Sequence, residues 1–241
     1  MKSVLSLKDL KVIIFLRLSK RRYFLMHSIF KNIIREVPGG KKYLVFEELK
    51  SRFLDKTGWT LSAKTREPVD VNGKEIPWFN YSSIHFLDQR IRKEFSIFEY
   101  GSGNSTFWFS ERAHKVISIE YDEKWFKKLE NRILTIQNIN LIFIKPESKE
   151  YAKYILGFTE EFDIVIIDGR DRVKCGLNSL KALKKDGVII WDDAERERYK
   201  EGHDFLYSNG FKSIEFFGLG PIRRRASVTT IFYREENCLG I

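Results

Sequence analysis

The chain has 241 residues, which is enough for one α/β domain of ordinary size and an extension. Hydrophobic residues make up 43% of it and aromatic residues 15%, which predicts a packed core and excludes a disordered chain. The two cysteines, Cys175 and Cys238, have no metal-type spacing, which excludes a disulfide framework and indicates a reducing compartment.

The positive charge is concentrated at the N-terminus. The net charge is +10, and residues 1–36 hold nine Lys and Arg against Asp9 and Glu36. Since the remaining residues are close to neutral for their number, the basic charge belongs to the N-terminal segment. A nucleic-acid substrate would instead need Lys and Arg around the active site. The charge pattern therefore argues against a nucleic-acid partner.

Residues 1–57 are predicted to form a basic helical extension. Apolar positions from Leu7 to Ile33 recur about three to five residues apart, with basic residues between them. The longest apolar run, 12–16, is shorter than the h-region of a signal peptide and than the about 20 residues of a membrane span. A cytoplasmic protein is therefore expected. The basic stretch has three open roles: packing on its own domain, peripheral contact with an anionic membrane, or oligomerisation.

Residues 58–241 are predicted to form the second domain. It begins with an irregular segment over 58–82 and a helix over 82–93, after which strands and helices alternate. The last helix is expected over 196–208, ending at the Asn209-Gly210 pair, which is typical of a helix C-terminus. The predicted strands cover residues 96–100, 115–120, 140–144, 163–167, 188–191, 212–217 and 228–233.

Two of the helices that follow strands have clear start signals. Asn104 or Ser105 is the expected N-cap of the first, and Asp122 is the expected N-cap of the second. The second helix also carries an apolar stripe at spacings of four residues, which we expect to pack in the core rather than to bind a ligand. The stripe consists of Trp125, Leu129 and Ile133.

The strand over 96–100 leads into the most informative motif. An apolar run containing Glu99 is followed by Gly101-Ser-Gly103, and the next apolar run ends at Glu120. Glycines let the backbone approach a ligand, and a carboxylate after the next strand can accept hydrogen bonds from ribose hydroxyls. The pattern predicts a nucleoside cofactor. Thr106 stands where a dinucleotide dehydrogenase has its third glycine, which argues against a nicotinamide oxidoreductase.

These residues resemble the first two motifs of the class I S-adenosylmethionine-dependent methyltransferases, in an uncharacterised bacterial branch of that family. The resemblance continues through 162–169 and 183–193 and ends in 229–233, so it covers roughly residues 75–235. It implies a three-layer, Rossmann-like α/β fold with a seven-stranded, mostly parallel sheet and a C-terminal antiparallel hairpin. It also implies a transferase that takes its methyl group from S-adenosylmethionine.

The resemblance assigns roles in cofactor binding. Gly101 and Gly103 would pass beneath the methionine and ribose portions, and Glu99 would orient the methionine end through its amino group. Glu120 would hold the ribose hydroxyls, and Tyr121 would flank the adenine. The full predicted cofactor set is Glu99, Gly101, Ser102, Gly103, Asn104, Ser105, Glu120, Tyr121, Asp168 and Gly169.

Asp168, Asp192 and Asp193 are the candidate catalytic residues. They follow two neighbouring predicted strands, and three carboxylates placed together repel one another unless a cation or a proton intervenes. The pattern is similar to catechol-type O-methyltransferases, in which such residues hold Mg²⁺, although Asp193 replaces an Asn and Arg170-Asp-Arg172 replaces a Lys. Three roles stay open: Mg²⁺ ligands, a general base, or ion pairs with the arginines.

The acceptor is predicted to be a hydroxyl of a small molecule or a glycan precursor. No Asn-Pro-Pro-Tyr-like motif for nitrogen methylation follows the fourth strand. Residues expected on the acceptor side are Trp78, Tyr81, His85, Arg90 and, for an anionic group, Arg223, Arg224 and Arg225. The alternative is a non-catalytic Rossmann-like module that its basic N-terminal helix anchors to a membrane or a partner.

Overall fold

A computed structural model describes residues 31–241 of the chain. The described residues divide into two units, one that ends at Lys56 and one from Thr57 to Ile241. The predicted amphipathic segment before residue 31, including the 12–16 run, lies outside the described residues. In the rest of the first unit the helical prediction is confirmed: residues 31–36 are helical, and α3 (Gly40–Leu49) runs into a π-helical turn, η1 (Lys50–Leu54).

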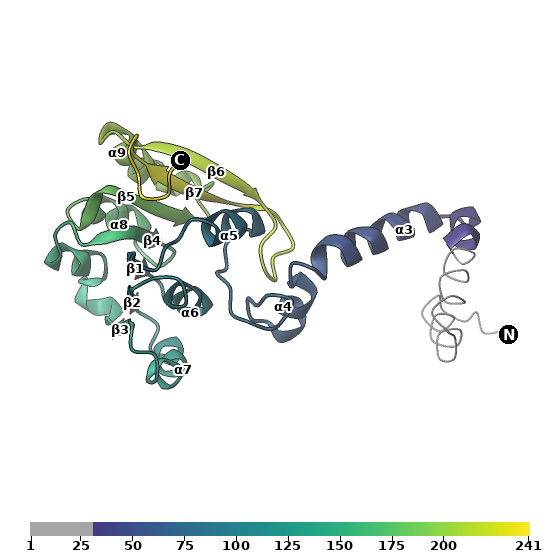
Figure 1. The fold of residues 1–241 in the computed structure, drawn as a ribbon, viewed down its shortest axis with the longest axis horizontal. Coiled ribbons are helices and arrows are strands. Elements are labelled where there is room, and N and C mark those ends of the chain that lie inside the picture. The colour runs from purple at the N-terminus through teal and green to yellow at the C-terminus, as the bar shows by residue number, and fades with distance from the viewer. Residues whose placement is uncertain (1–30) are drawn as a thin grey trace. The chain divides into compact units, whose positions relative to one another are not determined.

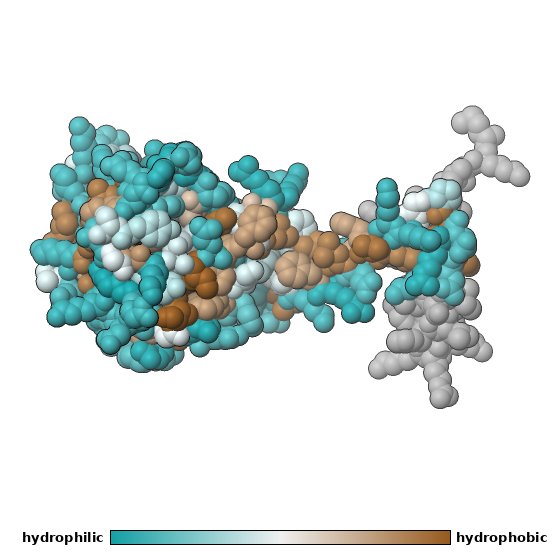
Figure 2. All heavy atoms as spheres, turned by 90° about the horizontal axis from the view of Figure 1, so that it is seen from above, coloured by the Kyte–Doolittle hydropathy of each residue, from teal (hydrophilic) through white to brown (hydrophobic). Residues whose placement is uncertain are grey.

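The α3 helix carries apolar side chains on its surface. Val45, Phe46 and Leu49 are each more than half exposed. Figure 2, coloured by hydropathy, shows brown, hydrophobic side chains at the surface among teal, hydrophilic ones. Within residues 31–241, no helix combines the length and the apolar character that crossing a membrane requires.

The second unit begins with more regular structure than the sequence predicted. The segment expected to be irregular contains a helix, α4 (Trp59–Thr65), and a short antiparallel bridge between Val69 and Glu75. The helix α5 (Tyr81–Asp88) follows, and the side chain of Asn80 caps it by accepting a hydrogen bond from the backbone N–H of Ser83 at 2.9 Å.

Seven strands form one sheet in the order β3-β2-β1-β4-β5-β7-β6 (Figure 1). The first five are parallel to one another, and β7 is antiparallel to both β5 and β6. This confirms the predicted fold class. The strands are β1 (Ser96–Tyr100), β2 (Lys115–Glu120), β3 (Ile139–Phe143), β4 (Phe162–Ile167), β5 (Leu183–Asp192), β6 (Lys212–Gly218) and β7 (Ser227–Tyr233).

The β5 strand is longer than predicted. Leu183 pairs with Phe162 and Val188 pairs with Ile164, so residues 184–187 form an irregularity within one strand rather than a turn before it. Such a bulge is hard to see in a sequence, because Lys185-Asp-Gly187 has the composition of a turn.

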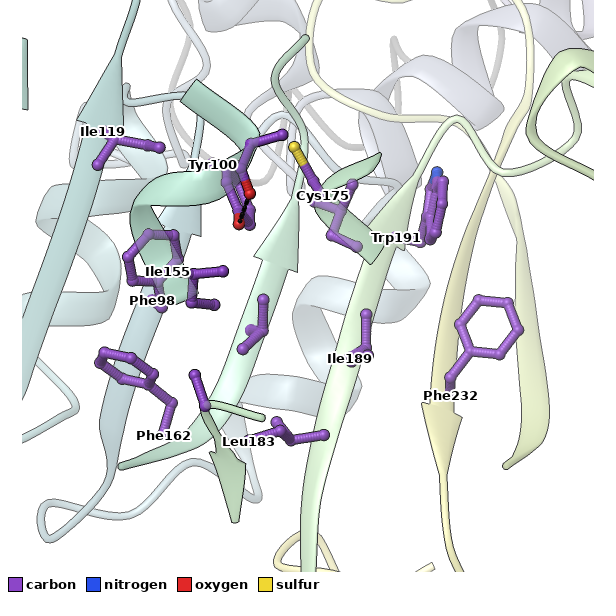
Figure 3. Packing of buried hydrophobic residues seen from close by; sticks show 14 of the residues in the cluster. Phe98, Tyr100, Ile119, Ile155, Phe162, Cys175, Leu183, Ile189, Trp191 and Phe232 are labelled. Carbon is purple, nitrogen blue, oxygen red and sulfur yellow. Dashed lines mark hydrogen bonds between the residues drawn. The ribbon is translucent and has the colours of Figure 1, made fainter. Parts of the chain in front are cut away.

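The two faces of the sheet hold two separate parts of the core. Along β4, Ile164 and Ile166 pack on one face and Val165 and Ile167 on the other, because successive side chains of a strand point to opposite sides. Figure 3 shows the second face, where Phe98 on β1 and Trp191 on β5 belong to one buried cluster that extends across the sheet. Both faces being buried explains why β4 is a continuous apolar run.

Helices cover each face and complete the three layers. The first face packs against α5 and α6 (Asn104–Ser110), and α7 (Glu123–Ile133) packs beside α6 through Leu129 and Phe107. The second face packs against η3 (Tyr151–Gly157), α8 (Arg172–Ser179) and α9 (Lys200–Ser208). Two short turns, η2 (Pro146–Ser148) and η4 (Glu197–Tyr199), lie between the longer elements.

The helix start signals were partly correct. Asp122 caps α7, as predicted, by accepting a hydrogen bond from Trp125 N–H at 2.9 Å. The N-cap of α6 is Gly103, not Asn104 or Ser105. Asn104 is instead the first residue of the helix, and its amide NH2 donates a hydrogen bond to the carbonyl of Pro68 at 2.8 Å.

Candidate functional site

A cavity of about 1090 Å³ opens at the carboxyl ends of β1, β2 and β4. In an open parallel sheet this edge, beside the point where strand order reverses, is where ligands bind. Nine of the ten residues predicted for cofactor binding line the cavity, which brings together segments far apart in the chain. They are Gly101, Ser102, Gly103, Asn104, Ser105, Glu120, Tyr121, Asp168 and Gly169.

The floor of the cavity needs a glycine at position 101. Gly101 has φ +93°, a left-handed conformation that residues with side chains rarely adopt. A Cβ atom there would lie 3.0 Å from the backbone oxygen of Asp168 and 3.0 Å from Gly169. The turn after β1 therefore lies directly against the turn after β4, which leaves room above both for a ligand.

Glu120 ends β2 with a buried carboxylate whose oxygens are held by backbone donors. Its Oε1 accepts hydrogen bonds from the N–H groups of Tyr121 and Asp122 at 2.8 Å, and its Oε2 accepts one from Ser102 N–H at 3.1 Å. Burial raises the pKa of Glu120 from its ordinary value, and these donors act against the rise. A carboxylate has about four acceptor positions, so Glu120 keeps one for a ligand hydroxyl.

Glu99 does not line the cavity. It is fully buried, and its carboxylate accepts hydrogen bonds from Ser105, from Thr106 Oγ1 at 2.5 Å and from Ser118 Oγ at 2.7 Å. Burial raises the pKa of Glu99 to about 7, although these three hydroxyls oppose the rise. Contact between Glu99 and a cofactor stays a prediction. Its hydrogen bond with Ser105, which lines the cavity, is present in the structure.

Thr106 explains why this chain lacks a third glycine. Its hydroxyl accepts a hydrogen bond from Gly103 N–H at 3.0 Å and donates to Glu99. The side chain thus joins the Gly-x-Gly turn to the buried carboxylate of β1. A glycine here would leave both groups without this partner.

Aromatic side chains form one wall of the cavity. The ring of Tyr121 lies edge-on to that of Tyr151 with centroids 5.8 Å apart, and the guanidinium of Arg170 lies 4.5 Å from the Tyr121 centroid. Trp125 also lines this wall, and its indole N–H donates to the carbonyl of Ser102 at 2.7 Å. The predicted core stripe is confirmed, because Leu129 and Ile133 are buried and Trp125 is partly buried against them. Trp125 lines the cavity in addition, which the sequence did not predict.

The three predicted aspartates do come together, and arginines pair with each of them. Arg172 Nη2 lies 2.7 Å from Oδ1 of Asp168, and Arg223 Nη2 lies 3.1 Å from Oδ2 of Asp192. Arg223 also pairs with Asp193 through its other Nη atom. The remaining partners are Thr229, whose hydroxyl donates to Asp192 at 2.7 Å, and Arg196, which pairs with Asp193.

The surroundings of the three carboxyl groups shift their pKa values in different directions. Burial raises the pKa of Asp192 well above its usual value, and burial also raises that of Asp168 although Arg172 opposes the rise. Burial acts in the same direction on Asp193, but the contact and charge of Arg223 outweigh it and lower the pKa. Asp168 and Asp193 line the cavity, whereas Asp192 is fully buried beneath it.

This arrangement does not fit a Mg²⁺ site. Among residues 31–241, no group of three or more His, Cys, Asp or Glu side chains is placed to hold a metal ion. Guanidinium groups already neutralise the aspartates, so the ion-pair alternative describes the cluster best. The partner is however Arg223 rather than Arg170, because Arg170 lies over Tyr121 instead.

One wall of the cavity was not predicted from the sequence. Thr65, Arg66, Glu67 and Pro68, at the end of α4, line it together with Lys128, which pairs with Glu67 at 2.7 Å. Since this segment was expected to be irregular, nothing in it signalled a site. Of the four acceptor-side residues expected before β1, Trp78 lines the cavity, whereas Tyr81, His85 and Arg90 do not.

Comparisons with known proteins support the fold. No family model matches the sequence, and no curated protein matches it either. Among solved structures, precorrin-6y C5,15-methyltransferase from Geobacter metallireducens is similar with a TM-score of 0.50 and 12% identity, over 63% of this chain and 87% of that one. An rRNA methylase from Streptococcus thermophilus has a TM-score of 0.49 and 16% identity, over 64% and 96%.

At these identities the similarity is one of fold. A methyltransferase from Geobacter sulfurreducens has a TM-score of 0.48 and 15% identity over 73% of this chain and 85% of that one. The similarity to the precorrin-6y methyltransferase, with its TM-score of 0.50, agrees with the fold that the resemblance implied. The finer similarity to catechol-type enzymes is not shown.

Proposed function

We propose that this chain is an S-adenosylmethionine-dependent methyltransferase that acts on a hydroxyl of a small molecule or a glycan precursor. The observation that carries the proposal is the position of Glu120. Its buried carboxylate lies at the end of β2 beside the Gly101 turn, in a cavity large enough for a nucleoside and an acceptor together.

The residues present fit the proposed cofactor. The remaining acceptor position of Glu120 suits a ribose hydroxyl, and the aromatic wall of Tyr121 and Trp125 suits a flat base. The left-handed turn at Gly101 provides the close backbone approach that a nucleoside needs. When bound, S-adenosylmethionine supplies an activated methyl group on a positively charged sulfur.

Asp168 is the best candidate among the three aspartates for removing the acceptor's proton. It lines the cavity, and burial raises its pKa, which makes its carboxylate a stronger base than an exposed aspartate. Asp193 is a weaker base because its pKa is lowered, and Asp192 does not reach the cavity. Asp168 would accept the proton of the acceptor's O–H group. S-adenosylmethionine would supply the methyl group, and its sulfur would keep the electron pair of the broken carbon–sulfur bond and leave as S-adenosylhomocysteine.

Positioning supplies the rest of the rate enhancement. Holding two reactants in line can contribute roughly 7–11 kcal/mol to lowering a barrier. The residues of this chain would contribute by keeping the cavity walls in place. Glu99 on β1 binds Ser105 of α6 and Ser118 of β2, and Arg172 of α8 pairs with Asp168 after β4.

Methyl-labelled S-adenosylmethionine tests the acceptor class. The full chain would be incubated with a cell extract divided into small molecules, glycans, RNA and protein, with Asp168→Asn as a parallel variant. We expect label in the small-molecule or glycan fraction and its loss in the variant. Label confined to RNA or protein would contradict the proposed acceptor, and label in no fraction would contradict the activity.

A further inference from the structure

We propose that the acceptor carries an anionic group, a phosphate or a carboxylate, and that Arg66, Arg224 and Arg225 bind it at the mouth of the cavity. The inference rests on the proposed function and specifies its substrate class. All three side chains line the cavity and are exposed. Within residues 31–241 none of the three has a side-chain hydrogen bond or an ion pair.

The lining of the cavity carries charge of both signs. Glu120 at the end of β2 and Asp122 just after it contribute carboxylates, which suits a cofactor whose reactive sulfur is positive. Arginines from four other segments of the chain line the same cavity. These are Arg66, Arg172, Arg196, Arg223, Arg224 and Arg225.

The six arginines differ in whether an aspartate neutralises their charge. Arg172, Arg196 and Arg223 are matched by the three aspartates, so their charge is already neutralised. Three positive charges remain at the cavity mouth. An exposed arginine is ordinarily a solvated residue, but three of them around one cavity produce a field that attracts an anion. Their planar guanidinium groups match the oxygens of phosphate or carboxylate.

The loop that carries two of these arginines is held in one conformation. Arg223 binds Asp192 and Asp193 with its side chain, and its carbonyl accepts a hydrogen bond from the indole N–H of Trp59 at 2.8 Å. At the start of the loop, Leu219 accepts a hydrogen bond from Tyr81 N–H at 2.9 Å. A loop fixed at both points presents the next two arginines at little further cost in conformational entropy.

Backbone strain in the same two segments also supports a binding site at this place. Ile222 has φ 64° and Arg66 has φ 62°, both left-handed, and for a β-branched residue such as Ile222 this is unusual. Strained residues persist where the surroundings hold them, often at binding sites. Both strained positions adjoin or belong to the proposed anion site. Trp78, 45% exposed on the cavity wall, offers a flat surface for the body of the acceptor.

The test uses the full chain saturated with S-adenosylhomocysteine, titrated by calorimetry in 150 mM salt. Glucose 6-phosphate and glucuronate are the two anionic probes, and glucose is their neutral match. We expect saturable binding of at least one acid and none of glucose; which acid binds tells phosphate from carboxylate. The double variant Arg224→Ala/Arg225→Ala should lose at least tenfold in affinity.

A matched control removes two charges elsewhere. Lys181 and Lys185 are exposed near the start of β5, far along the strand from the cavity, so Lys181→Ala/Lys185→Ala should bind the acid as the wild type does. Equal loss in both double variants, or no saturable binding of either acid, overturns the inference. Because S-adenosylhomocysteine binding is measured first on each protein, its failure identifies an error in the proposed function instead.

Discussion

The guanidinium of Arg223 lies 3.1 Å from the fully buried carboxylate of Asp192, although the two residues are 31 positions apart. Arg223 belongs to the loop between β6 and β7, and Asp192 ends β5. The pair therefore joins the antiparallel hairpin to the parallel part of the sheet at the edge of the cavity. It also occupies the position for which the sequence left a metal site as one of three alternatives.

Removing Arg223 should be costly, because it leaves Asp192 buried without a cationic partner. Loss of one member of a buried ion pair typically costs about 3–5 kcal/mol. Arg223→Ala is expected to lower the unfolding free energy by an amount in that range, measured by urea denaturation at pH 7. Arg224→Ala, which removes an exposed neighbour, should change it by less than about 0.5 kcal/mol.

A second substitution distinguishes the ion pair from general loop damage. Adding Asp192→Asn to Arg223→Ala removes the stranded charge, so much of the lost stability should return. If the double variant is no more stable than Arg223→Ala, the pair does not account for the loss.

Chelation should have little effect on this protein, because arginines already neutralise the aspartate cluster. After dialysis against EDTA, the affinity for S-adenosylhomocysteine and the melting temperature should stay as they were. Adding Mg²⁺ back should likewise change neither. A rise in melting temperature on addition of Mg²⁺ that Asp193→Asn abolishes would restore the metal interpretation.

Gly101→Ala should damage both stability and binding. The substitution places a Cβ in a left-handed position, 3.0 Å from the backbone of Asp168 and Gly169. The strain is expected to cost about 1–2 kcal/mol, and binding of S-adenosylhomocysteine should weaken because the β1 and β4 turns move apart. Gly157→Ala is the control, since a Cβ there meets nothing within 4 Å. Wild-type binding by Gly101→Ala would show that the turn does not contact the ligand.

Glu99 should make the protein less stable as the pH rises. Its pKa is about 7 in the folded protein and about 4.5 in an unfolded chain, so between these values the folded state binds more protons. Stability is therefore greatest below about pH 4.5 with respect to this group, falls between pH 4.5 and 7, and then levels off. Glu99→Gln cannot ionise and should not show this fall.

Urea denaturation at pH 5, 6, 7 and 8 checks this prediction. The stability of Glu99→Gln relative to the wild type should increase with pH by up to about 3 kcal/mol, since each unit of pKa shift corresponds to about 1.4 kcal/mol. Parallel pH profiles for the two proteins would contradict the raised pKa of Glu99.

The sequence correctly predicted those elements whose local pattern of apolar residues matches their burial in the folded protein. β1 and β2 have the predicted bounds, because both are short apolar runs with clear ends. The Gly-x-Gly turn and Glu120 follow these strands, so their convergence could be predicted as well. The N-cap of α6 could not be predicted in this way. Asn104, the expected cap, forms a hydrogen bond to Pro68, which is distant in the sequence.

The remaining errors also arise from tertiary contacts. Arg223 is far from the aspartates in sequence, and only the antiparallel hairpin brings it to them. Trp125 packs against the core as its spacing predicts, but its indole N–H also reaches Ser102 at the cavity edge, and the spacing gives no sign of that second contact. Amphipathic spacing shows which side of a helix is apolar; it does not show whether that side meets the core or a ligand.

The most direct test of the proposed function is calorimetric titration of the full chain with S-adenosylhomocysteine, with NAD⁺ as the control ligand. We expect micromolar binding of S-adenosylhomocysteine and none of NAD⁺. Glu120→Ala should weaken it at least tenfold, as expected for loss of a charged hydrogen-bond partner worth about 1.5–3 kcal/mol. Glu123→Ala, an exposed neighbour paired with Lys127, should bind as the wild type does. Absence of binding by the folded wild-type protein, or equal affinity in Glu120→Ala, would contradict the account.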